Sequence, residues 1–192
     1  MNILVISDIH ADAAALRTAL GSFPNADLLL LCGDYLNHGP RNPLPDGWNP
    51  PETAALLNGR AEKIVCVRGN CDSEVDEMML SFPCLAPYTN VLLAPEKTPA
   101  PRPTRIFAHH GHLYDRKKLS SWLGKGTVVV SGHTHVTVLE EENGLVFFNP
   151  GSLSLPKCAD GKTCGIITAD GGGVSKITLC SIEGKTLRSL EL

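Results

Sequence analysis

The sequence predicts an α/β fold in which two sheets pack face to face and helices flank them. Up to Val67, apolar strand-like runs alternate with helix-like segments, which is typical of a parallel sheet with right-handed crossovers. After Val136, short β-like runs follow one another across Asn-Gly, Pro-Gly and Gly-rich turns. This second pattern indicates a mixed or antiparallel sheet in the other half of the chain.

Strands are predicted where short runs are rich in Leu, Ile and Val and end at turn residues. Before the change of pattern they are Asn2–Ile6, Asp27–Cys32, Lys63–Val67, Arg105–His109 and Thr127–Ser131. After it they are Val136–Leu139, Leu145–Phe148, Thr163–Ala169 and Val174–Cys180.

Helices are predicted between several of these strands. Ala11–Leu20 has Ala and Leu at helical spacing, with Asp12 as a favourable acid in the first turn and Gly21 as the stop. The other helical segments are Glu52–Gly59, Ser73–Leu80 and Leu119–Leu123. The Pro-rich stretch Pro95–Pro103 indicates a loop. Because each side of it lacks half of the candidate site described below, we expect one domain over residues 1–192.

Composition narrows the function classes. With 192 residues, of which 43% are hydrophobic, the chain can bury a substantial core, and its net charge of −3 gives no sign of a polybasic surface for nucleic acid or lipid. There is no signal-peptide pattern or membrane-spanning stretch, so a soluble cytoplasmic protein with no membrane partner is expected. The seven cysteines are odd in number and form no Cys-x-x-Cys, which favours reduced, buried thiols over disulfides.

Five segments share one pattern, in which a potential metal ligand follows an apolar strand. They are Asp8-Ile9-His10, Gly33-Asp34, Gly69-Asn70-Cys71-Asp72, His110-Gly111-His112 and His133-Thr134-His135. In open α/β sheets the carboxyl ends of strands form the crevice where sites are built, and glycine lets the backbone turn sharply there. The pattern therefore predicts one metal centre assembled from distant strand ends.

The candidate ligands are carboxylate, amide and imidazole groups, without the thiolate cluster of a structural zinc site. Mixed nitrogen and oxygen sets suit Mn, Fe, Zn, Co or Ni better than calcium. Seven ligands are too many for one tetrahedral ion and suit two ions that share a bridging carboxylate. Two metals roughly 3.5–4 Å apart are the usual device for in-line displacement at phosphorus.

The motifs Asp-x-His, Gly-Asp, Gly-Asn-x-Asp, His-Gly and Gly-His-x-His, in this order, resemble those of the calcineurin-like metallophosphoesterase superfamily across residues 1–152. Residues 33–42, 68–76 and 149–152 are similar to the small bacterial phosphodiesterases of the YfcE type. The resemblance implies a four-layer α/β/β/α sandwich. It also implies a phosphodiesterase in which a metal-bound hydroxide attacks the phosphorus of a small-molecule substrate.

The resemblance implies the metal ligands as well. Asp8, His10 and His135 would hold one ion, Asn70, His110 and His133 the other, and Asp34 would bridge the two. Mn2+ is the commonest activating ion in this branch and is therefore expected, with Ni2+, Fe2+, Zn2+ and Mg2+ as alternatives. Relatives also imply a homo-oligomer.

Two catalytic candidates follow Asn70. Cys71 stands where the wider superfamily commonly has a histidine that acts as general acid, so it is either a replacement for that group or a small space-filling residue. In the second case the leaving group must be protonated from elsewhere, or acidic leaving groups are favoured. Asp72 either orients a ligand histidine or caps the helix over Ser73–Leu80.

Three residues are candidates for substrate binding. His38 and Arg41 lie in a Gly/Pro loop just past Asp34, and Arg41 is either a clamp for a phosphodiester oxygen or a solvated cation. His112 either lines the substrate pocket or is exposed.

Two neighbouring features have weaker links to the site. Consecutive residues of a strand face opposite sides, so His109 is not expected to reach the metals together with His110. The segment Asn149-Pro150-Gly151-Ser152 is chiefly a turn signal, with a role at the rim of the site as the alternative.

The predicted function is hydrolysis of a phosphodiester. A phosphomonoesterase or a nuclease using the same site is the alternative, but the missing histidine at position 71 and the short chain argue against both, and no stable nucleic-acid complex is expected. A third hypothesis is a non-catalytic protein-binding scaffold, as in the retromer coat subunit. Such a scaffold would be expected to lose metal ligands, whereas this chain keeps all seven positions.

Overall fold

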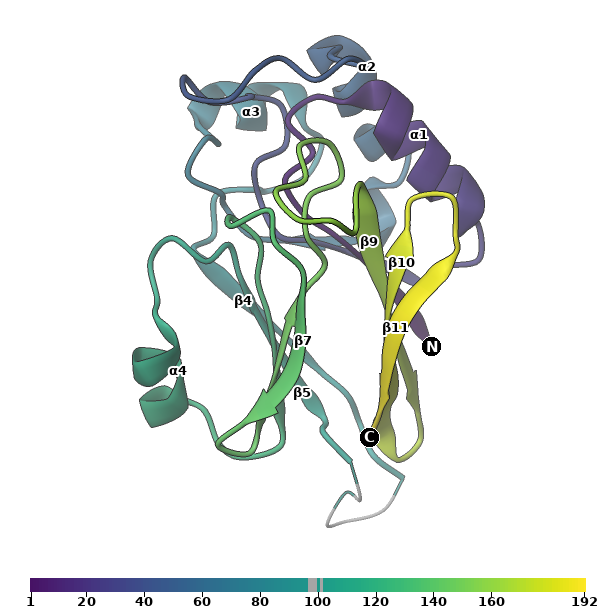
Figure 1. The fold of residues 1–192 in the computed structure, drawn as a ribbon, viewed down its shortest axis with the longest axis vertical. Coiled ribbons are helices and arrows are strands. Elements are labelled where there is room, and N and C mark those ends of the chain that lie inside the picture. Colours follow the sequence, from purple (N-terminus) through teal and green to yellow (C-terminus); the bar gives the residue numbers. More distant parts are fainter. Residues whose placement is uncertain (97–99, 101) are drawn as a thin grey trace.

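The computed structural model describes residues 1–96, 100 and 102–192, and contains two β-sheets with helices outside them (Figure 1). Part of the loop predicted over Pro95–Pro103 therefore lies outside the described residues, namely 97–99 and 101. Among the residues that are described, no helix is both long and apolar enough to cross a membrane.

The first sheet has the strand order β11-β10-β9-β1-β2-β3. Strands β1 (Asn2–Ile6), β2 (Leu28–Leu31) and β3 (Ile64–Cys66) are parallel, as predicted. Strands β9 (Thr163–Asp170), β10 (Gly173–Ser181) and β11 (Thr186–Glu191) continue the sheet in antiparallel pairs.

The prediction that each half of the chain forms its own sheet was therefore wrong. Strand β9 returns to the N-terminal strand, and Leu4 pairs with Leu29 on one side and with Ile166 on the other. This pairing satisfies the backbone groups on both sides of β1, which would otherwise be an unpaired sheet edge.

The second sheet has the order β4-β5-β6-β8-β7. Its central strands β5 (Arg105–His109), β6 (Thr127–Val130) and β8 (Leu145–Asn149) are parallel, and β4 (Tyr88–Leu92) and β7 (Val138–Glu142) pair antiparallel at its edges. Sequence analysis missed β4 and β11. Neither has a buried position or a continuous apolar run, because each lies at an edge.

Helices α1 (Ala13–Ser22), α2 (Pro50–Asn58) and α3 (Glu74–Met79) lie at one end of the molecule in Figure 1, and a 3-10 turn spans Ala61–Lys63. Helix α4 (Arg116–Trp122) lies outside the second sheet, and the predicted segment Leu119–Leu123 is only its last part. Asp12 caps α1, because its side chain accepts a hydrogen bond from the backbone N–H of Ala15 at 2.9 Å.

Three apolar clusters separate the four layers. The central cluster joins the inner faces of the sheets and includes Ile3, Val5, Leu30, Ile106, Val128 and Phe148. The alternate residues Leu4 and Ile6 face α1 and α2, whereas Phe107 and Phe147 face Leu119 of α4. Because both faces of each central strand are covered, the strands are apolar without alternation. The predicted four-layer α/β/β/α sandwich is confirmed.

Candidate metal centre

The turns that follow the strands of both sheets meet in one place. On the first sheet, the backbone N–H groups of Asp8 and His10 donate to the carbonyls of Gly33 and Asp34, at 3.1 and 3.0 Å. On the second sheet, the N–H of Gly132 donates to the carbonyl of His110 at 2.7 Å. The N–H of His133 donates to Asp8 Oδ2 at 3.0 Å, which links the two sets of turns.

Five of the seven predicted ligands have a left-handed backbone. Their φ angles are 54° at Asp8, 47° at His10, 58° at Asp34, 69° at His133 and 59° at His135. Non-glycine residues rarely adopt this conformation, which costs on the order of 1–3 kcal/mol for each residue. Such strain is typical of residues whose positions are set by function, and here it turns the chain sharply at each ligand.

Glycines allow these turns to approach one another closely. A Cβ atom on Gly132 would lie 1.8 Å from Ser7 Oγ and 2.7 Å from Asp8 Oδ2. A Cβ atom on Gly69 would lie 2.0 Å from Asp34 Oδ1. Neither position has room for a side chain, so the glycine before each of these ligand segments is required by packing around the carboxylates.

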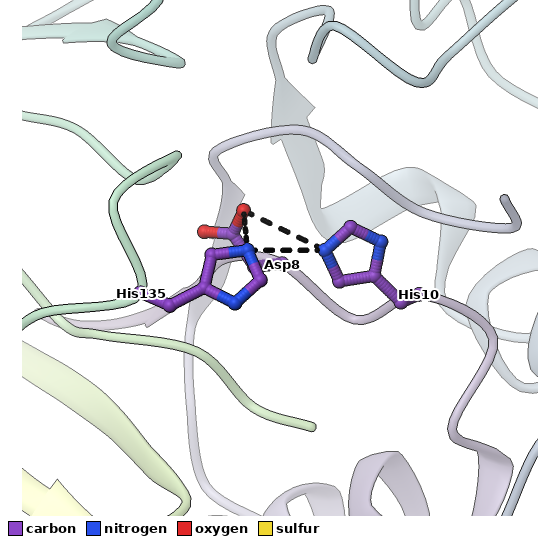
Figure 2. A group of neighbouring side chains, drawn as sticks. All are labelled: Asp8, His10 and His135. Carbon is purple, nitrogen blue, oxygen red and sulfur yellow. Dashed lines mark hydrogen bonds and ion pairs between the residues drawn. The ribbon is translucent and has the colours of Figure 1, made fainter. Parts of the chain in front are cut away.

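The first group of ligands is formed by Asp8, His10 and His135, all of which are buried (Figure 2). Asp8 Oδ1 lies 3.2 Å from His135 Nε2 and 3.8 Å from His10 Nε2, and the two Nε2 atoms are 3.3 Å apart. Three ligand atoms from three different turns therefore converge on one small volume.

The tautomers of the two imidazoles in this group follow from their hydrogen bonds. His10 Nδ1 lies 2.8 Å from the carbonyl oxygen of Asn37, and His135 Nδ1 lies 2.6 Å from that of Leu155. Each Nδ1 must carry a proton to donate, so each neutral ring directs a bare Nε2 lone pair at the other. Asp8 Oδ1 is buried as well and accepts no hydrogen bond. A cation between these three atoms would satisfy all of them, so the group fits a metal ion.

The second group is built around Asn70. Its Oδ1 atom lies 3.0 Å from His110 Nε2 and 2.7 Å from His133 Nδ1. Because His110 Nδ1 donates to the carbonyl of Cys32 at 2.6 Å, the Nε2 atom of a neutral His110 is again a bare lone pair that faces an oxygen.

Asp34 lies between the two groups. Its Oδ2 atom is 3.5 Å from His110 Nε2 in one group and 3.8 Å from His10 Nε2 in the other. The structure thus brings all seven predicted ligands together, in two groups with one shared carboxylate.

The pKa shifts favour the metal-binding form of Asp8, His10 and His133, and work against it at His135. Burial lowers the pKa of His10 and of His133, which keeps both rings neutral. Burial acts to raise the pKa of Asp8, but its pairing with His135 and the charge of His110 outweigh burial and hold the pKa below its usual value. His135 has a raised pKa, because its pairing with Asp8 outweighs burial.

Residues 1–172 match the family profile of the calcineurin-like phosphoesterase superfamily domain. The chain belongs to the calcineurin-like phosphoesterase superfamily. It is 42% identical to phosphodiesterase YfcE of Escherichia coli K12 over 172 residues, which is 88% of this chain and 89% of that protein. It is 28% identical to a probable metallophosphoesterase, YsnB of Bacillus subtilis, over 88% of this chain and 85% of that protein.

Solved structures agree with the family. The structure of the Escherichia coli phosphoesterase Yfce superposes with a TM-score of 0.88 at 36% identity, over 100% of this chain and 99% of that chain. Vps29 of Entamoeba histolytica complexed with Zn2+ superposes at 0.63 with 19% identity over 100% and 99%, which shows a shared fold alone. The protein is a metal-dependent phosphoester hydrolase.

Asp72 supports the phosphoesterase site in a way that sequence analysis did not foresee. Its carboxylate accepts hydrogen bonds from the backbone N–H groups of Gly69 at 2.6 Å, Tyr35 at 2.8 Å and Asp34 at 2.9 Å. It therefore fixes the turn that carries Asp34 rather than orienting a histidine. Burial and the charge of Asp34 raise the pKa of Asp72 to about 7, against the opposing effect of the three N–H donors.

The alternative in which Asp72 caps the following helix was wrong. Ser73 is the N-cap of α3 and forms a capping box with Asp76, whose Oδ2 accepts from the Ser73 N–H at 2.6 Å. The carboxylate of Asp72 is already engaged by the turn on its other side, so the cap is formed one residue later.

Cys71 is half-buried beside Asp34, and its backbone N–H donates to Asp34 Oδ1 at 2.9 Å. Its Sγ atom packs against Gly39, where an added Cβ would lie 2.9 Å from the sulfur. Burial, followed by the charge of Asp34, raises the pKa of the Cys71 thiol to about 12. Such a weak acid in close packing favours the space-filling interpretation over that of a general acid.

A cleft of about 960 Å³ opens over the ligands. Arg41 lines it, as does Lys157, an exposed residue that sequence analysis missed because no motif adjoins it. His38 is not among the lining residues and places its ring edge-on to Trp48. His112 is exposed, with its ring centre 5.3 Å from that of His110.

The Asn149–Ser152 turn and Ser154, two residues beyond it, hold the ligand turns from behind. Asn149 Nδ2 donates to the carbonyl of Gly132 at 2.8 Å and to Thr134 Oγ1 at 3.2 Å. The hydroxyls of Ser152 and Ser154 both donate to the backbone carbonyl of Asp8, at 2.9 and 3.0 Å. Residues 149–152 were predicted chiefly as a turn, with a role at the rim of the site as the alternative, and Ser154 was not predicted. The one available signal was the place of this segment after an apolar strand.

Proposed function

We propose that this phosphoesterase hydrolyses small-molecule phosphodiesters with two divalent metal ions, for which Mn2+ is the expected activator. The observation that carries the proposal is the arrangement of seven ligands in two groups that share Asp34. A shared carboxylate flanked by imidazoles on both sides is what a two-metal site for displacement at phosphorus needs. Similarity to a phosphodiesterase over most of the chain supports the same reaction.

The bound ions would polarise the phosphoryl oxygens and supply a water of lowered pKa. In the proposed arrangement Asp8, His10 and His135 hold one ion, Asn70, His110 and His133 hold the other, and Asp34 contacts both. Arg41 and Lys157 stand at the cleft as the cations that orient the anionic substrate.

The side chains near the ligands bear on the choice between diester and monoester. The thiol of Cys71 is packed against Gly39, and its pKa is raised to about 12, so it is a weak acid for protonating a leaving alkoxide. A diester with an acidic alcohol as its leaving group needs no such donor. His112, beside His110 and His133, is the titratable group best placed to assist with other substrates.

We further propose that residues 1–192 act as one metallophosphoesterase domain in the cytoplasm and self-associate into a homo-oligomer. All seven cysteines are free, which suits a reducing compartment.

The test measures hydrolysis of an aryl phosphodiester, an aryl phosphomonoester and single-stranded DNA by metal-stripped protein after addition of Mn2+, Ni2+, Mg2+ or Zn2+. We expect the diester to be cleaved fastest with Mn2+, and activity to vanish with chelator or in Asp34→Ala. Faster monoester or DNA cleavage would replace the proposed substrate class. Equal activity in chelator would refute the role of metal, and no activity with any ion would favour the scaffold hypothesis.

A further inference from the structure

A second pocket of about 220 Å³ lies between α4 and the face of the second sheet that α4 covers. Apolar side chains of Tyr114, Leu119, Val138 and Phe147 line it, together with the ring of His109. These residues belong to β5, α4, β7 and β8 and the loop before α4, and none is a predicted metal ligand. The pocket opens on the opposite side of the sheet from the inter-sheet core.

His109 is unusual among the walls of this pocket. The residue is only 3% exposed, and its Nδ1 atom is buried without a hydrogen-bond partner. Buried polar groups are nearly always paired, so an imidazole left in this state beside a cavity is a candidate for contact with a ligand. The ring is one of a row, with centres 5.9 Å from that of Phe107 and 5.8 Å from that of Tyr114.

The charges at the pocket are paired with one another. Arg116 forms ion pairs with Glu140 and Glu142 on β7, and its guanidinium lies 4.7 Å from the centre of the Phe147 ring. Asp115 is engaged as the N-cap of α4, where it accepts from the N–H of Lys118 at 2.8 Å. Among the described residues that line the pocket, both charged groups, Asp115 and Arg116, are already engaged, so the lining suits an uncharged ligand.

The pocket touches the back of the metal centre. Gly132 and Thr134, which flank His133, line it together with Asn149, and Thr134 also lines the catalytic cleft. Asn149 donates to both Gly132 and Thr134, so one small hydrogen-bonded unit separates the two cavities. A ligand beneath α4 would contact the turn that carries a metal ligand without entering the cleft.

We propose that this pocket binds a neutral, single-ring aromatic compound with one hydroxyl group, of the phenol class. A cavity of about 150 Å³ is enough for benzene in a protein core, and this pocket is somewhat larger. The aromatic and aliphatic walls match the ring. A hydroxyl group both donates and accepts hydrogen bonds, so it can pair with the imidazole of His109 in either neutral tautomer.

The test is a titration of the Mg2+-loaded protein with phenol, toluene and benzoate, followed by two-dimensional amide NMR. We expect phenol to give saturable shifts at Leu119, Val138, Phe147 and Thr134, with a dissociation constant on the order of 1 mM. Toluene should bind more weakly and benzoate at least tenfold more weakly. Shifts that do not saturate, or that scatter over the surface, would overturn the proposal, and so would benzoate binding as tightly as phenol.

Two variants test the contacts. His109→Phe keeps a ring but removes both nitrogens, and should weaken phenol binding about fivefold while leaving toluene unchanged. Val138→Phe fills the pocket and should abolish binding of both, whereas the same change at Val75, 63% exposed on α3, should have no effect. Thermal unfolding checks that each variant is folded. Phenol binding that survives Val138→Phe, or that falls no more than toluene binding in His109→Phe, would contradict the assignment.

Discussion

Asn149→Ala should loosen the turn that carries His133 and His135. Asn149 is 2% exposed and makes three hydrogen bonds, as donor to Gly132 and Thr134 and as acceptor from the N–H of Gly151 at 2.9 Å. The carbonyl of Gly132 keeps a second partner, the N–H of Thr134 at 2.8 Å, and the exposed hydroxyl of Thr134 can turn to water. The buried N–H of Gly151 has no evident replacement.

These contacts set the size of the effect. Leaving the buried N–H of Gly151 without an acceptor costs about 1–3 kcal/mol. Loss of each of the two hydrogen bonds that Asn149 donates costs about 0.5–1.5 kcal/mol. We therefore expect the free energy of unfolding of the metal-free protein to fall by about 3 kcal/mol. Since residues that orient metal ligands typically contribute about 10–100-fold to metal affinity, we also expect weaker Mn2+ binding of that order.

The assay is urea denaturation of chelated protein, paired with a Mn2+ titration followed by diester hydrolysis. Asn90→Ala is the matched control, because Asn90 lies exposed on the edge strand β4, where its Oδ1 accepts from Arg105 Nε. This control should shift stability by no more than about 0.5 kcal/mol. If Asn149→Ala unfolds at the wild-type urea concentration and takes up Mn2+ as tightly, then the turn does not depend on Asn149 and the reasoning fails.

Substitutions at Gly132 and Lys157 and the addition of Mn2+ test other parts of the site. Gly132→Ala should destabilise the protein by about 1–3 kcal/mol or more in urea denaturation, because its Cβ would overlap Ser7 Oγ. If adding Ser7→Ala to this variant restores no stability, then the overlap is not the cause. Lys157→Ala should raise KM for the diester about tenfold without changing the melting temperature, and an unchanged KM would exclude contact with the substrate. Mn2+ at about 100 times its dissociation constant should stabilise the wild-type protein by about 2.7 kcal/mol in calorimetry, and should stabilise Asp34→Ala far less. Equal stabilisation of the two proteins would show that the ion binds away from Asp34.

Most strands, and the meeting of the candidate ligands in one place, were predictable from sequence because local signals set them. Buried parallel strands such as β1 and β2 are continuous apolar runs. Each is followed by polar residues, which at the end of a buried strand indicate a functional site. Since the carboxyl ends of such strands meet, the order of the motifs was enough to place Asp8, Asp34 and His133 in one centre. The alternation of side chains also separated His110, which faces Asn70, from His109 on the outer face.

The supporting contacts were not predictable, because they depend on which turns become neighbours. Asp72 binds the backbone of Asp34 and Tyr35, far back in the chain, and no local spacing encodes that pairing. The pairing of β9 was not predictable either, because nothing in its local sequence favours β1 over β8, the preceding strand in the chain, as its partner. Lys157 reaches the cleft only because its backbone N–H bonds the carbonyl of His135.

Residues outside the cleft stabilise the turns that carry the candidate ligands. Left-handed ligands, bare Nε2 atoms that face one another and the unpaired Asp8 Oδ1 all oppose folding before an ion binds. The opposing contacts come from groups that never reach the cleft, namely the carboxylate of Asp72 beneath Asp34 and the hydroxyls of Ser152 and Ser154 beneath Asp8. Their hydrogen bonds are made to backbone atoms, so they fix the turns and leave the ligand atoms free. We therefore expect metal affinity to depend on the backbone contacts of Asp72, Ser152 and Ser154 as well as on the candidate ligands.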